Sequence, residues 1–348
     1  GVPLSEADRD FRDEIRDFLA AALTADIRAV PRTDSERLDR MRLWQRKLHD
    51  ARLAAISWPT EFGGRRATPV QQLIFNAEMA GARAPEPINR SAINQLGPTI
   101  IQWGTDEQRD YYLPRILSAD DVWCQGFSEP DAGSDLASLS TRALIRDDEL
   151  VITGQKVWTS KAHYANCIYL LARTDPNAKP REGISYILAD LDTDGIDVRP
   201  IRQISGGAEF SEVFFQDVRV PLRNVLGPLH DGWRVAKSTL GYERVGQSRT
   251  HRIERRLDIL LAMAKEPNAL SESGFEDTFV TDHLVRFTAQ VEALRQIAAQ
   301  ATAAGVRGVS PGPEASMAKL LTSEVDQAMA NFGLDLAGAP GPLDPGSP

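Results

Sequence analysis

The hydrophobic pattern of this chain changes twice, and these changes constrain its fold more than any other feature. Residues 1–120 place large apolar side chains such as Phe11 and Ile15 at helical spacing. Residues 121–232 contain short apolar runs between Asp, Gly and Pro turns, and residues 233–348 return to helical spacing. We therefore predict an α+β multi-domain protein with an N-terminal helical bundle, a central antiparallel β-domain and a C-terminal helical bundle that is incomplete at its C-terminal end.

Individual elements follow from the same periodicities. Helices are predicted over residues 6–23, 38–48, 70–79, 92–103 and 106–113, with Pro114 after the last, and core-facing helical stripes over 284–297 and 317–332. Strands are predicted over residues 149–160, 166–172, 183–190 and 212–220, which are rich in Val, Ile, Phe and Tyr. Because short turns rather than helices separate these strands, an antiparallel sheet is favoured over βαβ units.

The charge of the chain argues against a nucleic-acid binder, and its cysteines and histidines argue against disulfide and metal sites. The net charge is −9, whereas a global nucleic-acid binder is normally basic. Cys124 and Cys167 lie in or beside apolar runs, so we expect buried free thiols. The five histidines show no metal-ligand spacing, and we predict no metal site.

No membrane segment is expected in this sequence. No stretch approaches the 18 apolar residues of a transmembrane helix. The first residues, Gly1 to Glu6, become charged at once, which is not typical of a signal peptide. We predict a cytoplasmic protein without a membrane partner.

The segment from Trp123 to Asp135 is the most informative in the chain. A strand runs into a loop that contains Ser128, Gly133 and Ser134. Such a loop offers hydroxyl and backbone N–H groups to the polar edge or phosphates of a ligand. On residue types alone, a turn that closes the strand is the alternative interpretation.

A second segment, Gly154 to Ser160, places an aromatic ring beside two hydroxyl groups. Trp158, followed by Thr159 and Ser160, offers a face and donors to a planar cofactor. A tryptophan in the interior of a strand is the alternative interpretation.

Together these two segments, FSEPDAGSD at 127–135 and GQKVWTS at 154–160, resemble the two flavin-contacting signatures of acyl-CoA dehydrogenases. Three further stretches match in family order: WPTEFGG at 58–64, FFQDVRVP at 214–221 and ASMAK at 315–319. The resemblance implies the same fold of helical bundle, β-domain and helical bundle, with FAD between the β-domain and the C-terminal helices.

The resemblance also implies the cofactor contacts. Residues of the first segment would line the isoalloxazine and its pyrimidine edge, namely Gln125, Phe127, Ser128, Gly133 and Ser134. From the other strand, Trp158, Thr159 and Ser160 would pack against the ring and bond to it. Ser134 would also touch the CoA moiety.

A third segment carries the residue that the resemblance makes catalytic. Without the resemblance, Glu243 and Arg244 indicate a solvent-exposed helix face. In the isovaleryl and long-chain members of the family, however, a glutamate at this helix position is the catalytic base. Arg244 matches an arginine that helps to hold the CoA nucleotide or neighbouring structure. Gly241 and Tyr242 would lie on the substrate side, and the small Gly241 would leave room for bulk.

The implied reaction is the α,β-dehydrogenation of an acyl-CoA thioester. Glu243 would abstract the weakly acidic α-proton in a dry pocket, where burial raises a glutamate pKa towards working pH. Flavin N5 would accept the β-hydride, and the product would be the 2,3-enoyl-CoA.

Two departures from the family pattern bear on assembly. Residues 262–282 lack the Arg-x-x-Phe-Gly segment, and the nearest match to Gln-x-x-Gly-Gly is residues 331–338. The expected partners are an acyl-CoA substrate, an electron acceptor such as an electron-transfer flavoprotein, and further subunits in a homo- or hetero-oligomer. Two alternatives remain open: a non-catalytic partner subunit of a heteromeric dehydrogenase, and a flavin oxidase or monooxygenase on the same fold.

Overall fold

The computed structural model describes residues 4–204, 206–246, 250–265, 276–306 and 312–337, without the side chains of residues 243–251, 301–306 and 315. The chain folds as two compact units. Unit 1 comprises residues 1–20, 68–84 and 244–348, and unit 2 comprises residues 21–67 and 85–243. The boundaries of the three sequence regions remain a prediction.

The described α- and π-helices of unit 2 are α2 (Ala25–Arg28), α3 (Asp34–Asp50), a π-helical segment η2 (Ala92–Leu96), α5 (Gly97–Trp103), α6 (Asp106–Ser118) and α7 (Gly232–Gly246), of which the last three residues belong to unit 1. Helix α3, η2 with α5, and α6 correspond to predicted helices, whereas α2 was not predicted and no bounds were predicted for α7. The prediction that a helix ends before Pro114 is wrong, because α6 continues through this residue. Proline removes one backbone donor from the helix. The buried side chains of Leu113, Ile116 and Leu117 on both sides of it keep the last turn packed.

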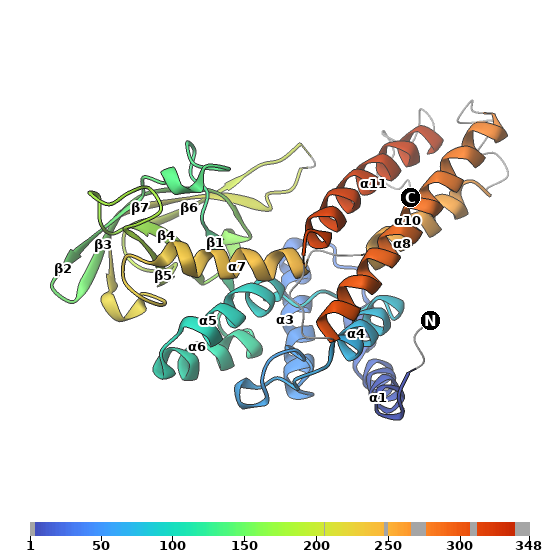
Figure 1. Cartoon of the computed structure of the whole chain (residues 1–348), viewed down its shortest axis with the longest axis horizontal. Coiled ribbons are helices and arrows are strands. Elements are labelled where there is room, and N and C mark those ends of the chain that lie inside the picture. Colours follow the sequence, from blue (N-terminus) through green and yellow to red (C-terminus); the bar gives the residue numbers. More distant parts are fainter. Residues whose placement is uncertain (1–3, 205, 247–249, 266–275, 307–311, 338–348) are drawn as a thin grey trace. The chain divides into compact units, whose positions relative to one another are not determined.

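Seven described strands form one sheet, shown in Figure 1. They are β1 (Trp123–Gly126), β2 (Arg142–Arg146), β3 (Glu149–Ser160), β4 (Cys167–Arg173), β5 (Ile184–Asp190), β6 (Ile196–Ile201) and β7 (Phe210–Pro221), in the order β1-β4-β2-β3-β7-β6 with β5 also paired to β4. Most pairings are antiparallel, as predicted, but β1 runs parallel to β4 and β2 meets β4 in parallel at one residue pair.

Strands β2 and β6 were not predicted, because their side chains are largely exposed. Strand β2 buries only Ala143, and β6 alternates between half-buried and exposed residues. Neither strand therefore carries the apolar run by which the other strands were recognised.

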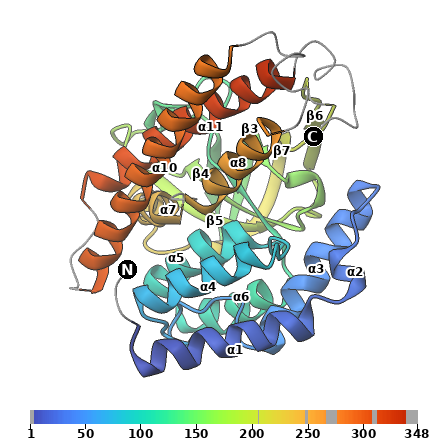
Figure 2. The same ribbon diagram turned by 90° about the vertical axis from the view of Figure 1, so that its right-hand side faces the viewer.

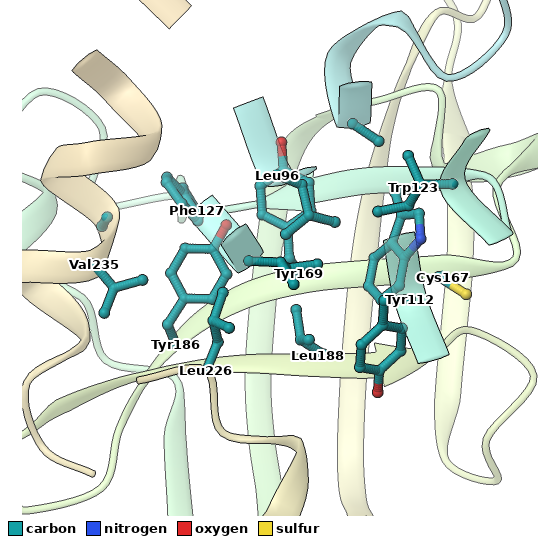
Figure 3. Packing of buried hydrophobic residues seen from close by; sticks show 14 of the residues in the cluster. Leu96, Tyr112, Trp123, Phe127, Cys167, Tyr169, Tyr186, Leu188, Leu226 and Val235 are labelled. Carbon is teal, nitrogen blue, oxygen red and sulfur yellow. The ribbon is translucent and has the colours of Figure 1, made fainter. Parts of the chain in front are cut away.

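Strand β4 is covered on both faces, which explains its uninterrupted apolar sequence. Side chains alternate between the two faces of a strand. Tyr169 and Leu171 face a core shared with α5, α6 and α7, whereas Ile168 and Leu170 face a second core formed with β3 and β7. Figure 3 shows the first of these cores, with Tyr169 and Tyr186 between Phe127 and Leu188.

Helix α7 is fixed to α5 and to the sheet by hydroxyl groups. Thr239 Oγ1 lies 3.0 Å from Thr99 Oγ1, and Trp103 Nε1 donates to Ser238 Oγ at 3.1 Å. Thr239 Oγ1 also donates to the hydroxyl of Tyr186 on β5 at 3.4 Å. Figure 1 shows α7 beside α5.

Unit 1 is helical and contains α1 (Glu6–Ala22), α4 (Pro69–Gly81), α8 (Thr250–Met263), α10 (Asp277–Val306) and α11 (Glu314–Ala337). The last two residues of α1 belong to unit 2. Figure 2 shows α8, α10 and α11 side by side, and Phe287, Val291 and Met329 are among the residues buried between them. The stripe over 317–332 is only partly core-facing, because Met317 and Leu320 are 57% and 58% exposed.

The two cysteines of the described chain agree with the sequence. Cys124 and Cys167 are buried free thiols, as predicted. None of the helices in the described ranges is long and apolar enough to cross a membrane.

Candidate functional site

The structure brings together, within unit 2, the two segments that resemble flavin-contacting signatures, residues 127–135 and 154–160. The backbone N–H of Val157 donates to the carbonyl oxygen of Ser128 at 2.9 Å. The ammonium group of Lys156 donates to the carbonyl oxygen of Phe127 at 3.1 Å. The loop that follows β1 therefore lies against the C-terminal end of β3. Together the two segments form one continuous surface.

A buried ion pair joins the same two segments. Lys156 Nζ lies 2.7 Å from Glu129 Oε1, and the two side chains are 0% and 3% exposed. Glu129 Oε2 also accepts from the N–H of Ser140 at 2.6 Å, and Glu129 Oε1 from the N–H of Thr141 at 3.0 Å. Burial alone would raise the pKa of Glu129, but the charge of Lys156 and these hydrogen bonds outweigh it and lower the pKa to about 2. Burial lowers the pKa of Lys156, against the charge of Glu129.

The loop after Glu129 is both a turn and an accessible surface. The backbones of Glu129 and Ala132 exchange hydrogen bonds of 3.0 and 3.2 Å, so the strand does close in a turn. Beyond it, Gly133 and Ser134 are exposed, and no described atom lies within 4 Å of the position that a Cβ would take at Gly133. The turn therefore leaves the hydroxyl of Ser134 accessible to a ligand.

Trp158 is not an interior tryptophan. Its ring is 60% exposed and meets the edge of Phe210 at a centroid distance of 6.1 Å. Its φ of 58° is left-handed, and the register of β3 against β7 shifts between Lys156 and Thr159. A β-bulge re-aims the side chain that it carries, which here presents an aromatic ring on the surface of unit 2.

The two hydroxyl residues after Trp158 face opposite sides. Ser160 is exposed. Thr159 is 1% exposed, and its Oγ1 has no hydrogen-bond partner among the described residues. Ser211, opposite Thr159 on β7, has the same buried and unpartnered hydroxyl in this part of the chain.

Gln125 and Phe127 lie on the side of the sheet that faces α5. Phe127 is buried, with its ring edge-on to Tyr169 and Tyr186 at 5.8 Å each. Gln125 is half-buried, and its Oε1 accepts from the Tyr169 hydroxyl at 3.0 Å. The same hydroxyl lies 3.2 Å from Oε1 of Gln95 in η2. Gln95 and Tyr169 were not predicted as site residues, although each is a polar residue inside an apolar run.

The remaining predicted residues lie on α7. Tyr242 donates from its hydroxyl to Gln102 Oε1 at 3.2 Å, and burial raises its pKa. No described atom lies within 4 Å of a Cβ position at Gly241. Glu243 belongs to α7, one turn after Thr239, and Arg244 follows it. The side chains of Glu243 and Arg244 lie outside the described part, so their roles remain predictions.

A metal centre has no support in the described ranges, because they contain no group of three or more His, Cys, Asp or Glu residues that could hold an ion.

Comparison with known proteins identifies the architecture. Three family models match in order: the acyl-CoA dehydrogenase N-terminal domain over residues 5–120, its middle domain over residues 124–218 and its C-terminal domain over residues 230–347. Together they cover most of the chain.

Similar sequences include two mycobacterial proteins. Acyl-CoA dehydrogenase IpdE1 of Mycobacterium tuberculosis is 38% identical over 341 residues, which span 95% of this chain and 86% of that protein. Acyl-CoA dehydrogenase FadE34 of the same organism is 37% identical over 97% of this chain, but over only 44% of its own length.

Similar solved structures include two whose titles name two components. The Tcur3481-Tcur3483 steroid ACAD has a TM-score of 0.84 at 32% identity and covers 100% of this chain and 89% of its own. The ChsE4-ChsE5 complex from Mycobacterium tuberculosis has a TM-score of 0.82 at 30% identity, with the same coverage.

These matches confirm the predicted fold and the predicted family, and they do not favour a non-catalytic subunit. Proteins of this group are oxidoreductases of lipid metabolism and generally depend on FAD. The chain belongs to the acyl-CoA dehydrogenase family.

Proposed function

We propose that this protein dehydrogenates an acyl-CoA thioester between its α- and β-carbons, with FAD as cofactor and Glu243 as the base. The observation that carries the proposal is the junction of the two predicted flavin-contacting segments. Val157 and Lys156 bond to the backbone of Ser128 and Phe127, so that both segments contribute to one surface of unit 2.

The residues on this surface fit a planar, phosphorylated cofactor. The exposed ring of Trp158 offers an aromatic face, and the exposed Ser134 beside the open position at Gly133 offers a hydroxyl and backbone donors. Gln125, Phe127, Ser128, Thr159 and Ser160 complete the set that we assign to FAD. Bound FAD would supply the acceptor for the two electrons and the hydrogen that leave the β-carbon.

Glu243 is the residue to which we assign proton transfer. Its carboxylate would take the α-proton, and the electron pair of that C–H bond would become the new α,β double bond as the β-hydrogen leaves as hydride. The product is then the 2,3-enoyl thioester. The position of Glu243 is supported by the anchoring of α7, because Thr239, one turn earlier, is tied to Thr99 and Tyr186. Arg244, with Tyr242 and Ser134, is assigned to the CoA side of the substrate.

The acyl group that we propose is bulky and contains a ring. One similar structure is titled a steroid ACAD, and Gly241 has open space around its Cβ position among the described atoms. A small residue two positions before the base leaves room for a substrate that a larger side chain would exclude.

We also propose that the protein works as an oligomer, either with copies of itself or with a related chain, and passes electrons to an electron-transfer flavoprotein. Two similar structures have titles that name two components. Met317 and Leu320 on α11 expose apolar surface that a partner subunit would cover.

The decisive experiment begins with purified protein reconstituted with FAD. Bound flavin should show its absorbance bands, and a ring-bearing acyl-CoA should bleach them under anaerobic conditions while an enoyl-CoA forms. Light scattering on the same sample should give a mass above that of the monomer. If FAD does not bind, even with a co-expressed related chain, the assignment of these segments fails.

A further inference from the structure

Three polar side chains from three different elements meet inside the first core of unit 2. Tyr169 of β4 is fully buried, and its hydroxyl lies 3.0 Å from Gln125 Oε1 on β1 and 3.2 Å from Gln95 Oε1 in η2. The surrounding residues are apolar, and Figure 3 shows Leu96 and Phe127 next to the Tyr169 ring. We call Gln95, Gln125 and Tyr169 the amide cluster.

The hydrogen-bonding capacity of the amide cluster exceeds what its members use. A tyrosine hydroxyl donates one hydrogen, whereas each glutamine carries two N–H donors and a carbonyl oxygen. The Tyr169 hydroxyl has one hydrogen for two neighbouring amides, so it donates to one of them and accepts an N–H from the other. Each amide still keeps at least one N–H donor for which the described part of the chain offers no partner. Both glutamines are only half-buried. The cluster therefore presents amide donors towards accessible space.

Gln95 is held rigidly in an unusual backbone. It belongs to the π-helical segment η2, and such segments occur frequently at functional sites. The indole N–H of Trp58 donates to the carbonyl oxygen of Ile93 at 3.0 Å, and a Cβ at Gly97 would collide with the same indole ring. These contacts fix the turn that carries Gln95, so its amide is positioned in advance of binding.

The amide cluster borders the predicted cofactor segment. Gln125 lies on β1 two residues before Phe127, whose ring contacts Tyr169. A plain hydrocarbon chain placed against unpartnered amide N–H groups would exclude water from them and leave them without any hydrogen-bond partner, which is unfavourable. Leu or Phe in place of Gln95 and Gln125 would suit a hydrocarbon ligand better. Amide donors instead suit a ligand that carries an oxygen acceptor.

We propose that the amide cluster binds an oxygen of the acyl group, so that the substrate class is a ring-bearing acyl-CoA with a ketone or hydroxyl group. This inference rests on the proposed dehydrogenase function. Tyr169 acts as a positioning residue that orients the two amides, and Gln95 is the residue that determines specificity. Gln95 is the better one to change, because Gln125 is also assigned to FAD.

The test compares two thioesters with the same carbon skeleton, cyclohexylpropanoyl-CoA and its 4-oxocyclohexyl counterpart. The FAD-loaded full chain should turn over the oxygenated thioester with the higher kcat/KM. Gln95→Met and Tyr169→Phe should each lower this preference roughly tenfold, the effect of about one hydrogen bond, mainly through KM. Tyr112→Phe removes a hydroxyl from the same core, and it should leave the preference unchanged.

The outcomes separate the two proposals. If wild type and variants turn over both thioesters in the same ratio, the substrate class is wrong although the dehydrogenase function stands. If Gln95→Met loses FAD while the ratio persists, the amide cluster serves the cofactor and the inference also fails. If no acyl-CoA is dehydrogenated by flavin-loaded protein, the proposed function itself fails and the inference with it.

Discussion

Lys156 and Glu129 form a buried ion pair of 2.7 Å that joins the two segments assigned to the flavin. Each charge has been removed from water, so each depends on the other and on the nearby hydrogen bonds from Ser140 and Thr141. The pair therefore fixes how the loop after β1 lies against β3. Its contribution to stability and its contribution to the cofactor surface can be measured separately.

Changing Lys156 to Met should destabilise the protein strongly. The substitution leaves the buried Glu129 carboxylate without its cation, and breaking a buried pair from one side costs about 3–5 kcal/mol. Urea titration followed by circular dichroism gives the change in the free energy of unfolding. The double variant Lys156→Met with Glu129→Gln should recover part of the loss, because no buried charge is left.

A matched control is the exposed pair between Arg219 and Glu149, 3.0 Å apart and 67% and 43% exposed. Arg219→Met should cost less than about 1 kcal/mol, since solvent screens such pairs. Equal losses from Lys156→Met and Arg219→Met would mean that the buried pair has no special role.

The acid stability of the protein should reflect Glu129. Its pKa is lowered from the ordinary 4.5 to about 2 in the folded protein, so its carboxylate stabilises the fold above pH 4.5. That contribution is lost as the pH falls from 4.5 towards about 2. The difference in unfolding free energy between wild type and Glu129→Gln should therefore shrink across this interval. A difference that is constant with pH would contradict the assigned pKa.

Trp158→Ala should separate cofactor binding from folding. Because the ring is 60% exposed, its removal should change the melting temperature of the apoprotein by only a few degrees. The dissociation constant of FAD, measured by flavin fluorescence, should rise by roughly three- to tenfold, in line with one lost aromatic contact. Tyr111→Ala, at 56% exposure, is the control that should leave FAD affinity unaltered. Unchanged affinity in Trp158→Ala would remove this ring from the cofactor site.

Among the strands, the sequence predicted those that bury apolar surface and missed those that do not. Strand β4 was recognised because Cys167 to Ala172 are all buried. Strands β2 and β6 carry mostly exposed residues and give no such pattern. The helix end at Pro114 was placed too early, since tertiary packing of Ile116 and Leu117 outweighs the one backbone bond that proline removes.

Local motifs predicted the candidate site better than they predicted its geometry. The exposed Trp158 depends on a bulge with positive φ, and a β-bulge at a tryptophan has no local sequence signature. The amide cluster depends on contacts between residues 74 and 44 positions apart, Tyr169 with Gln95 and with Gln125. Such pairs become visible only when the sheet and η2 are assembled.

The sharpest test of the proposed chemistry is Glu243→Gln. Glutamine keeps the size and much of the hydrogen bonding of glutamate but cannot accept the α-proton. FAD content and the free energy of unfolding should therefore match the wild type. Flavin reduction by an acyl-CoA, measured per bound FAD by stopped-flow absorbance, should slow by the ~10²–10⁴ that a positioned general base contributes.

The control for this variant is Glu107→Gln, an exposed glutamate in the first turn of α6. It removes one carboxylate from the surface of unit 2 and should reduce the flavin at the wild-type rate. A structural glutamate at position 243 would give the opposite pattern, in which Gln lowers FAD content or stability while reduction per flavin stays normal. Undiminished reduction in Glu243→Gln would assign the base to another residue or to a partner subunit.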